Sequence, residues 1–445
     1  MRLVYLIPLF FVLSNHLFAT SYKADNYIIT ITTYDSLYSY INVDCEFDLI
    51  RVDTASTDSL FLKFGGQLEE YSIDELLITL SDKNVKWKFY PKRKLLVFDT
   101  KISSKEIIKV KMTYSYLSLS VKWIYRGVSE FWENSYDEYY YPYIYGDIVN
   151  MDIKIKASVN NYIICSFKNQ GFQKLNDSIV EYNYSTQKTA SNFLVFGILP
   201  KTIYKKRFLK AKMPIVMYYI DSILIPNNRI KELADISYSG FQFYKEKLTY
   251  IKNNNLNDTL IYAFHTNGFS NRNNGSFIIA SQNKFATKPH ILPLVHEIGH
   301  RWYGEWNLFI EDGQPAAYFI KESINEYLTT VFAKEYYGQN YYDSLYINEY
   351  IKPYKKIFKT DKDKSLYSME YNNNNTVVYK KGVIIITKVA ERMGENNWIS
   401  FLKEFYIKYN NKTFEYSDFI SLLESKDKES ALSLDSYIKD KTSVF

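Results

Sequence analysis

Residues 296–304 read H-E-I-G-H-R-W-Y-G and contain the pattern H-E-x-x-H. On an α-helix, His296 and His300 lie on one face, so both imidazoles can bind a single metal ion. Glu297 is placed to accept a proton from a water molecule on that metal. Two nitrogen ligands beside a general base predict a zinc hydrolase, provided that a third ligand is found elsewhere in the chain.

Histidine is scarce, because the chain contains five in 445 residues. At that frequency, the chance of an accidental H-E-x-x-H is roughly a few in a thousand. The alternative is a buried helix whose two histidines make only structural hydrogen bonds. The other residues of the site must decide between these interpretations.

Length and charge restrict the class of protein. At 445 residues, the chain has room for two or three domains with substantial cores. Hydrophobic residues make up 47% and charged residues 23%, which is typical of a globular protein. The formal net charge of +6 is modest, and no long block of Lys and Arg occurs. We therefore expect no nucleic-acid-binding surface.

The N-terminus has the pattern of a secretory signal peptide. Arg2 supplies a positive charge, residues 3–13 are apolar, and Ala19 offers a small residue at the cleavage site. We expect an exported protein (secreted, periplasmic or cell-surface), with an uncleaved N-terminal anchor as the alternative. The apolar run is short for a transmembrane helix, and no other stretch has the length to span a bilayer.

The chain has two cysteines, Cys45 and Cys165. Export would permit a disulfide between them, but two separate buried thiols agree equally well with the sequence. Their pairing stays open.

Residues 20–206 have the pattern of a β-domain. Short runs of β-branched and aromatic residues, such as 27–32 and 107–112, alternate with turn residues. Strands that follow one another without intervening helices predict an antiparallel sheet or sandwich.

Residues 207–445 change to a mixed pattern. Strand-like runs at 215–219, 260–264 and 276–280 precede a predominantly helical part. We expect the motif helix to begin after Pro289 and to end near Gly304. Further helices are predicted at 226–247, 319–337, 379–393, 398–409 and 416–423. The fold class is therefore α+β and multi-domain, with a mixed α/β and then helical catalytic domain after the β-domain.

Glu322 and Glu326 are the candidates that complete the site. They stand four residues apart on the predicted helix 319–337 and share a face. One can bind zinc, while the other accepts a hydrogen bond from the free N–H of a ligand histidine and fixes its orientation. In isolation such a pair is more often a solvated helix surface, but its position shortly after H-E-x-x-H favours a metal site.

These segments resemble the gluzincin aminopeptidases, the aminopeptidase N-like family of zinc metallopeptidases. Residues 296–304 are similar to the family's H-E-x-x-H-x-W-F-G, and residues 319–327 (F-I-K-E-S-I-N-E-Y) look like its W-L-N-E-G-F-A-E-Y. The resemblance implies a peptide or protein substrate and one Zn²⁺ per chain. It also implies that His296, His300 and Glu322 are the metal ligands and that Glu297 is the general base. Glu326 is then the carboxylate that orients a ligand histidine.

Residues 378–382 (V-Y-K-K-G) look like the family's Y-x-K-G segment. The resemblance implies that Tyr379 hydrogen-bonds the tetrahedral intermediate. A phenol suits that role, because a donor aimed at the developing oxyanion stabilises charge that exists only in the transition state. Without the adjoining Lys381-Gly382, Tyr379 would be one tyrosine among 44.

The resemblance extends with less specific motifs to the N-terminal half. Tyr140-Tyr141-Pro142 and residues 193–197 are similar to parts of the family's saddle-shaped β-domain. The expected organisation is a signal peptide at 1–19, a β-domain at 20–206 and a thermolysin-like zinc peptidase domain at 207–445. Little chain is left for the C-terminal helical domain that many members carry.

One family feature has no counterpart. Members carry a G-x-M-E-N segment whose glutamate binds the free α-amino group of the substrate, and residues 269–275 (F-S-N-R-N-N-G) occupy the equivalent place. Arg272 replaces the glutamate, and no Asp or Glu occurs from Thr259 to Val295. An arginine would repel an α-ammonium group and favour a carboxylate or carbonyl. The candidate substrate-binding residues are Arg272, Asn273, Asn274 and Gly275.

Three functions stay open. The first is an exported zinc metallopeptidase of aminopeptidase type, with an acid of the N-terminal half, such as Glu130, Glu133 or Glu138, binding the amine. The second is a zinc endopeptidase, or a peptidase for blocked N-termini, which Arg272 favours. The third is a non-catalytic binding protein on a peptidase fold, which the intact set of catalytic residues argues against.

Overall fold

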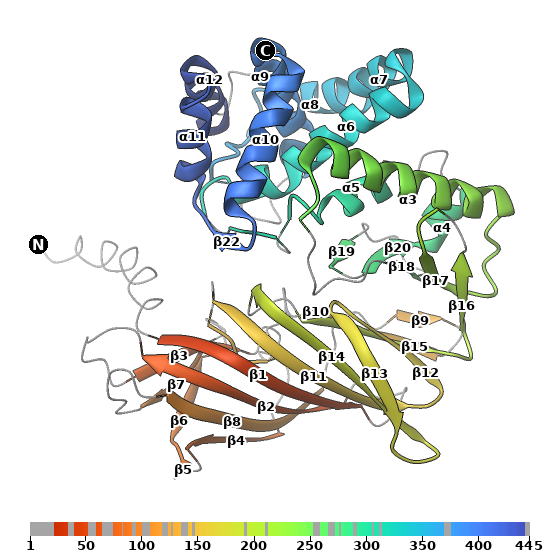
Figure 1. The fold of residues 1–445 in the computed structure, drawn as a ribbon, viewed down its shortest axis with the longest axis vertical. Coiled ribbons are helices and arrows are strands. Elements are labelled where there is room, and N and C mark those ends of the chain that lie inside the picture. Colours follow the sequence, from red (N-terminus) through yellow and green to blue (C-terminus); the bar gives the residue numbers. More distant parts are fainter. Residues whose placement is uncertain are drawn as a thin grey trace, which may run out of the picture. The chain divides into compact units, whose positions relative to one another are not determined.

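The computed structural model describes residues 22–33, 40–51, 59–64, 74–81, 83–90, 95–99, 107–117, 123–125, 128–134, 141–144, 147–190, 194–209, 212–251, 259–265, 272–275, 277–287, 292–304, 307–310, 314–368 and 375–440. The predicted signal peptide at 1–19 lies outside this part of the chain. No helix within it has the length and apolar character needed to cross a membrane. The chain divides into two compact units, the first built mainly from residues up to Lys205 and the second mainly from Lys206 onward (Figure 1).

The first unit is formed by strands. Its eight-stranded sheet has the order β13 (Lys168–Lys174), β14 (Ile179–Ala190), β11 (Ile148–Ser158), β1 (Tyr22–Thr33), β2 (Tyr40–Arg51), β8 (Ile107–Leu117), β4 (Asp74–Leu80) and β5 (Lys83–Asn84). Side chains alternate along these strands, as Ile29 and Ile31 of β1 are buried while Ile28 is exposed. This alternation buries one face of each strand in the core of the unit.

Two smaller sheets complete the first unit. One has the order β12 (Asn161–Cys165), β15 (Val195–Pro200), β10 (Val128–Asn134) and β9 (Trp123–Tyr125), and the other β3 (Ser59–Lys63), β7 (Leu95–Asp99) and β6 (Trp87–Tyr90). Cys45 on β2 and Cys165 on β12 are both buried free thiols, so they form no disulfide.

One strand pair departs from the expected antiparallel arrangement. β1 and β11 pair in parallel, with Tyr27 opposite Met151, whereas β1 and β2 are antiparallel. Parallel neighbours need a long connection between them. Here that connection contains the strands β2 to β10, which the sequence pattern alone does not reveal.

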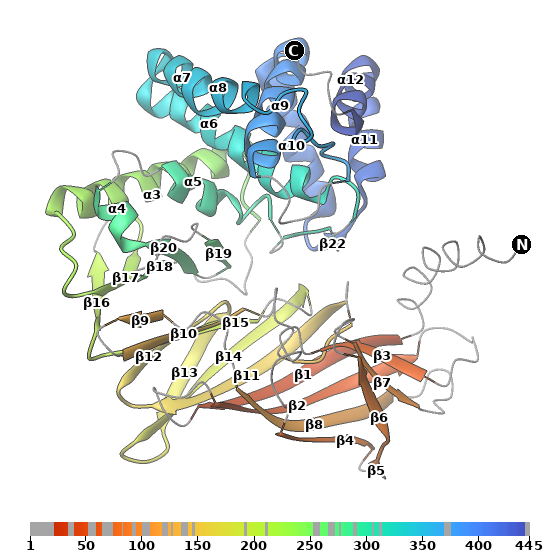
Figure 2. The ribbon, with the colours of Figure 1, turned by 180° about the vertical axis from the view of Figure 1, so that it is seen from behind.

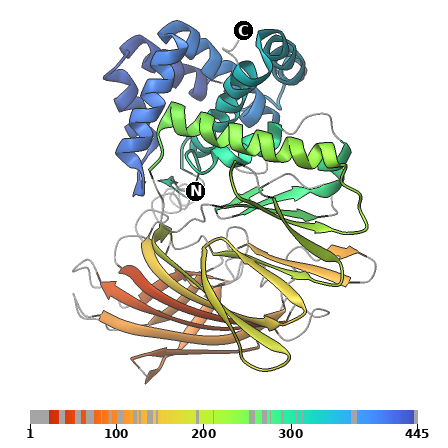
Figure 3. The ribbon, with the colours of Figure 1, turned by 45° about the vertical axis from the view of Figure 1, so that its right-hand side comes forward.

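The second unit begins with a five-stranded mixed sheet. Its order is β16 (Tyr204–Leu209), β17 (Ile215–Ile220), β18 (Leu260–His265), β20 (Phe277–Ser281) and β19 (Arg272–Asn274). β17, β18 and β20 are parallel, whereas the edge strand β19 is antiparallel to β20. The long helix α3 (Asn227–Leu248) lies over this sheet (Figure 3), and Figure 2 shows α5 (Leu292–Gly299) on the same side. Their apolar residues share one core with the strands.

The rest of the second unit is helical. It contains α4 (Gln282–Thr287), η2 (Phe319–Ser323), α6 (Ile324–Tyr337), α7 (Gln339–Leu345), η3 (Tyr346–Ile351), α8 (Lys352–Lys355), η4 (Thr376–Lys381), α9 (Gly382–Met393), α10 (Glu395–Tyr409), α11 (Tyr416–Glu424) and α12 (Lys428–Lys439), with a short parallel pair of β21 (Leu308–Phe309) and β22 (Lys412–Thr413). η2, η3 and η4 are π-helical turns that continue into α-helices. α4, α7, η3, α8 and α12 were not predicted from the sequence. In α12 the buried Ala431, Leu434 and Ile438 do follow a helical spacing, so a usable signal was present there.

Candidate metal centre

The helix α5 brings the motif into the core. Val295 and Ile298 are fully buried and anchor the short helix, on which His296 and Glu297 are buried as well. Gly299 ends the helix, and the side chains of Tyr244 and Asn325 occupy the space where a Cβ would lie. Any larger residue at this position would overlap them. Tyr244 Oη donates to Asn325 Oδ1 at 2.8 Å, and Asn325 Nδ2 donates to the carbonyl of His296 at 2.6 Å. The glycine thus allows a hydrogen-bonded support for the backbone that carries His296.

The motif helix ends earlier than predicted, at Gly299 rather than near Gly304. The backbone N–H groups of Trp302 and Tyr303 both donate to the carbonyl of Gly299, at 2.8 and 3.0 Å. The chain therefore leaves the helix in a tight turn, and His300 is its first residue. This turn places Nδ1 of His300 3.0 Å from the carbonyl of Tyr303. Because a carbonyl can only accept, Nδ1 carries the proton and Nε2 keeps its lone pair.

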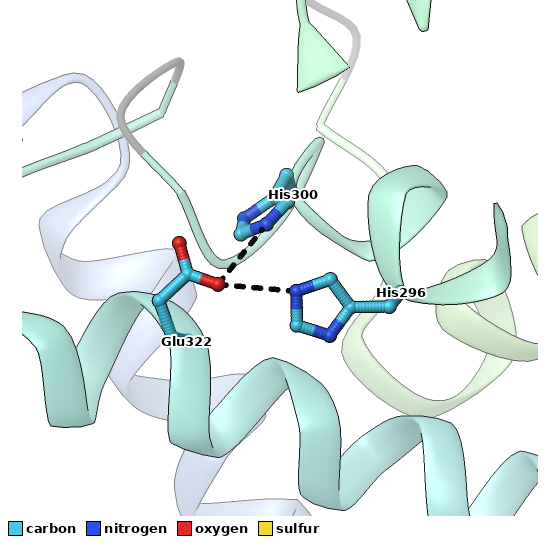
Figure 4. A group of neighbouring side chains, drawn as sticks. All are labelled: His296, His300 and Glu322. Atoms are coloured by element: carbon cyan, nitrogen blue, oxygen red, sulfur yellow. Dashed lines mark hydrogen bonds and ion pairs between the residues drawn. The ribbon is translucent and has the colours of Figure 1, made fainter. Parts of the chain in front are cut away.

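His296, His300 and Glu322 lie together although Glu322 comes from η2 (Figure 4). One ligand atom from each lies within 4.8 Å of the others. Nε2 of His296 is 3.1 Å from Oε2 of Glu322, and Nε2 of His300 is 3.6 Å from the same oxygen. Two imidazole nitrogens and one carboxylate oxygen are the donor set of a catalytic zinc site with an open position. The residues present therefore fit zinc.

A second carboxylate orients His296. Oε2 of Glu326, on α6, lies 2.9 Å from Nδ1 of His296. The ring is therefore held at Nδ1, and Nε2 is directed toward Glu322. This is the arrangement in which a carboxylate fixes the tautomer of a metal-binding histidine and raises its basicity. Glu326 stands where the sequence analysis placed the orienting carboxylate.

The charges of the cluster favour a cation. Burial alone would raise the pKa of Glu322, but His300 and His296 lower it to about 2, so this carboxylate is ionised at neutral pH. Burial lowers the pKa of His300 to about 4, which leaves its imidazole neutral and able to bind a metal. Burial also acts to lower the pKa of His296, but Glu322 and Glu326 raise it well above its ordinary value. Two carboxylates therefore create a negative potential where the imidazole nitrogens converge.

Tyr379 reaches the same oxygen from η4. Its hydroxyl donates to Oε2 of Glu322 at 2.9 Å, and its ring lies 5.7 Å from the ring of His296. The hydroxyl is thus directly beside the candidate metal ligands.

Glu297 follows His296 on α5 and is 6% exposed. This burial limits the access of bulk water to its carboxylate.

The four candidate substrate-binding residues lie on and after the edge strand β19. Arg272 pairs with Ile279 of β20, Asn274 pairs with Phe277, and Gly275 turns the chain with a φ of +69°. β19 contacts α5 and carries no acidic residue. Glu130 and Glu133 lie on β10 of the first unit, whereas Glu138 is outside the described residues.

Several residues of the site were missed by sequence reasoning. Asn325 supports the backbone of His296, the carbonyl of Tyr303 holds His300, and the hydroxyl of Tyr350 donates to Oε1 of Glu326 at 2.9 Å. Asn325 and Tyr303 are within the motif segments, so their proximity to ligands was a usable signal. Tyr350 carries no local signal, since its role depends on how η3 packs.

Comparison with solved structures identifies the fold. A mutant of the M1 zinc metallopeptidase from Deinococcus radiodurans, bound to Tyr-Ser-Ala substrate, matches with a TM-score of 0.72 and 10% identity over 95% of each chain. The M1 zinc metallopeptidase from the same organism matches with a TM-score of 0.71 and 10% identity, over 95% of this chain and 94% of that one. No curated protein matches the sequence. The expected fold class, a β-rich unit followed by a mixed and then helical one, is thereby confirmed.

A family model matches part of the second unit. Residues 275–439 match the family model described as Peptidase family M1 domain. This segment contains all three candidate metal ligands together with Glu297 and Tyr379. The match supports the predicted resemblance of this segment to the gluzincin aminopeptidases and agrees with Zn²⁺ as the cofactor.

Proposed function

We propose that the chain hydrolyses peptide bonds with His296, His300 and Glu322 holding zinc and Glu297 moving the protons. The observation that carries this proposal is the convergence of both Nε2 atoms and the Tyr379 hydroxyl on Oε2 of Glu322. A structural pair of buried histidines would not need a third donor and a phenol directed to one point.

When bound there, zinc supplies Lewis acidity, which polarises a carbonyl and lowers the pKa of a water molecule. The Glu297 carboxylate accepts the proton of the attacking water and then donates it to the leaving amine. Its position next to His296 in the chain supports this role, because the base must lie beside the ligands without being one of them. Glu322 stays ionised throughout, since its pKa is about 2.

Tyr379 stabilises the negative charge that develops on the carbonyl oxygen. Its hydroxyl donates to Glu322 in this structure, at 2.9 Å. A small rotation about its side-chain bonds redirects this donor to a substrate oxygen. A donor already held in the site requires little reorganisation during the reaction.

Two specificities are candidates, and they differ in whether the enzyme recognises the free N-terminus of the peptide. A similar solved structure contains Tyr-Ser-Ala as substrate, which supports short peptides with a free N-terminus. The lack of any Asp or Glu from Thr259 to Val295, which includes β19, favours instead an endopeptidase or a peptidase for blocked N-termini. We propose an aminopeptidase-like metallopeptidase without the usual acidic amine anchor, and endopeptidase action as the second candidate.

Matched peptides test this proposal. The zinc-loaded protein is assayed on pairs of peptides that differ only in a free or an acetylated N-terminus. Preference for the free amine supports aminopeptidase action through another acid, and equal or better cleavage of the acetylated peptide overturns it in favour of the second candidate. Removal of zinc by a chelator is expected to abolish cleavage, and added zinc to restore it. A protein that binds zinc and cleaves neither series supports the non-catalytic binding protein.

We also propose that the protein is exported. The support is the sequence pattern of Arg2, the apolar run 3–13 and Ala19. Expression of the full chain in a secreting host, followed by N-terminal sequencing, tests it. A mature N-terminus at Thr20 supports cleavage, and a chain retained with Met1 at the membrane supports the uncleaved anchor.

A further inference from the structure

Glu326 uses its two carboxylate oxygens in different directions. Oε2 faces Nδ1 of His296 at 2.9 Å, and Oε1 accepts the hydroxyl hydrogen of Tyr350 at 2.9 Å. A glutamate has three side-chain torsions, so one hydrogen bond leaves its carboxylate able to rotate. Bonds at both oxygens fix the plane of the carboxylate and with it the direction of Oε2.

Tyr350 is suited to hold this carboxylate. It is 4% exposed and lies on η3, 24 residues along the chain from Glu326. Burial is the main cause, and the charge of Glu326 the next, that raises the pKa of Tyr350 well above its ordinary value. The hydroxyl therefore stays protonated and remains a donor at neutral pH.

The ring of Tyr350 is held in turn by its neighbours. Nζ of Lys380 lies 4.7 Å from the ring centroid, and the ring of Tyr346 is 6.2 Å away. Lys380 belongs to η4, the same π-helical turn that carries Tyr379. A cation over the face of a desolvated tyrosine is favourable. Tyr350 is therefore a fixed point between η4 and Glu326 rather than a mobile surface side chain.

We propose that Tyr350 is a positioning residue for the metal ligand His296, acting through the carboxylate of Glu326. Its hydroxyl bonds to Oε1 of Glu326 and not to a ligand nitrogen. Its effect is to keep Oε2 of Glu326 on Nδ1 of His296, which holds the ring so that Nε2 faces the metal. This inference rests on the ligand role proposed for His296.

Zinc affinity of the metal-free protein, measured by competition with a chromophoric chelator, provides the test. Tyr350→Phe removes only the hydroxyl, and we expect about a tenfold loss of zinc affinity, the lower end of what residues outside the ligand set contribute. Tyr346→Phe is the matched control on the same turn. The hydroxyl of Tyr346 bonds to Thr387 instead, so its removal should leave zinc affinity unchanged.

A double-mutant cycle separates positioning from a general structural effect. In a Glu326→Ala background, Tyr350→Phe should no longer change zinc affinity, because the intermediary is missing. The same loss in both backgrounds would overturn the proposal, as would a Tyr350→Phe protein that binds zinc like the parent. Thermal unfolding of the metal-free variants establishes that each is folded; if Glu326→Ala is not, the comparison of Tyr350→Phe with Tyr346→Phe decides alone. A parent protein that binds no zinc would instead overturn the proposed function.

Discussion

Gly382 packs directly against Ser323, so closely that a Cβ on Gly382 would overlap the Cβ and Oγ of the serine. The serine hydroxyl also donates to the carbonyl of Val378 at 2.6 Å. These contacts join Ser323 of η2, one residue after Glu322, to Val378 of η4 and to Gly382 at the start of α9. The absence of a side chain at Gly382 therefore sets the distance at which Tyr379 can reach Glu322.

Gly382→Ala should move the two π-helical turns apart. We expect a loss of about 1 to 3 kcal/mol in the free energy of unfolding, as for other overpacked sites. We also expect kcat to fall on the order of 100-fold, because displacement by about 1 Å has that effect on a positioned group. Ser323→Gly combined with Gly382→Ala should restore part of kcat, since it returns the missing space. Steady-state kinetics on the single and double variants measure this, with Ser323→Gly alone as control; a double variant no better than Gly382→Ala would contradict the packing argument.

Lys381, the last residue of η4, forms a buried ion pair with Asp363. Nζ of Lys381 lies 2.9 Å from Oδ1 of Asp363, and their side chains are 0% and 1% exposed. The other carboxylate oxygen accepts from Tyr354 at 2.9 Å. Asp363→Asn removes the negative charge beside the buried lysine, which still donates to the backbone carbonyls of Lys364 and Asp440. We expect about 3 to 5 kcal/mol lower stability by denaturant unfolding.

The control for this ion pair is Asp361→Asn, because Asp361 is an exposed carboxylate two residues away. It should change the free energy of unfolding by less than about 0.5 kcal/mol. Equal losses in the two variants would show that the pair with Lys381 contributes nothing particular.

The metal ligands could be predicted from the sequence, whereas their supports could not. His296 and His300 are fixed by helical spacing, and the resemblance to a known segment selected Glu322. Tyr350 is one of 44 tyrosines, and only the packing of η3 against α6 gives it a partner. Asp363 lies in a turn between helices, where no periodicity indicates that a charge will be buried.

The limits of the fold prediction have a similar cause. Strand alternation in the first unit predicted the sheets, because it depends on neighbours along the chain. The parallel pairing of β1 with β11 joins residues such as Ile29 and Ile153, and that choice of partner depends on the whole sheet. The motif helix ends at Gly299 because Tyr244 and Asn325 pack there, which is again a contact between distant segments.

Asp147 should make the stability of the protein pH-dependent. Burial raises its pKa from 3.8 to about 6. The backbone N–H of Ala24, 2.6 Å from Oδ2, and the charge of Lys23 both act to lower this pKa but do not outweigh burial. Because the pKa of Asp147 is higher in the folded than in the unfolded state, folding favours the protonated carboxyl. This contribution to stability is fully present below pH 4 and is lost as the pH rises through 6. Between those limits we expect a loss of about 2 to 3 kcal/mol. Asp147→Asn keeps an acceptor for Ala24 and should remove this dependence. Denaturant unfolding of both proteins at pH 4.5 and 7 measures it, and parallel pH profiles would contradict the assignment.

Glu297→Gln should separate zinc binding from turnover. The amide has the size of the carboxylate but cannot take a proton from water. We expect kcat to fall by about 10² to 10⁴, the usual contribution of a general base, while zinc content by atomic absorption is unchanged. Glu326→Gln is the matched control, because it makes the same change at a residue that holds His296 and should mainly weaken zinc binding. Full activity in Glu297→Gln would overturn the proposed mechanism.

Tyr379→Phe decides between two roles for the hydroxyl that donates to Glu322 at 2.9 Å. If the phenol stabilises the developing oxyanion, its removal should lower kcat by about 10² to 10³ and leave KM and zinc affinity nearly unchanged, because the interaction with substrate exists only in the transition state. If it serves only to hold Glu322, zinc affinity should fall, and excess zinc should restore kcat. Kinetics at saturating zinc, together with chelator competition, distinguish the two outcomes. We expect the first, because the hydrogen bond from Tyr379 lowers the pKa of Glu322 less than His300 and His296 do.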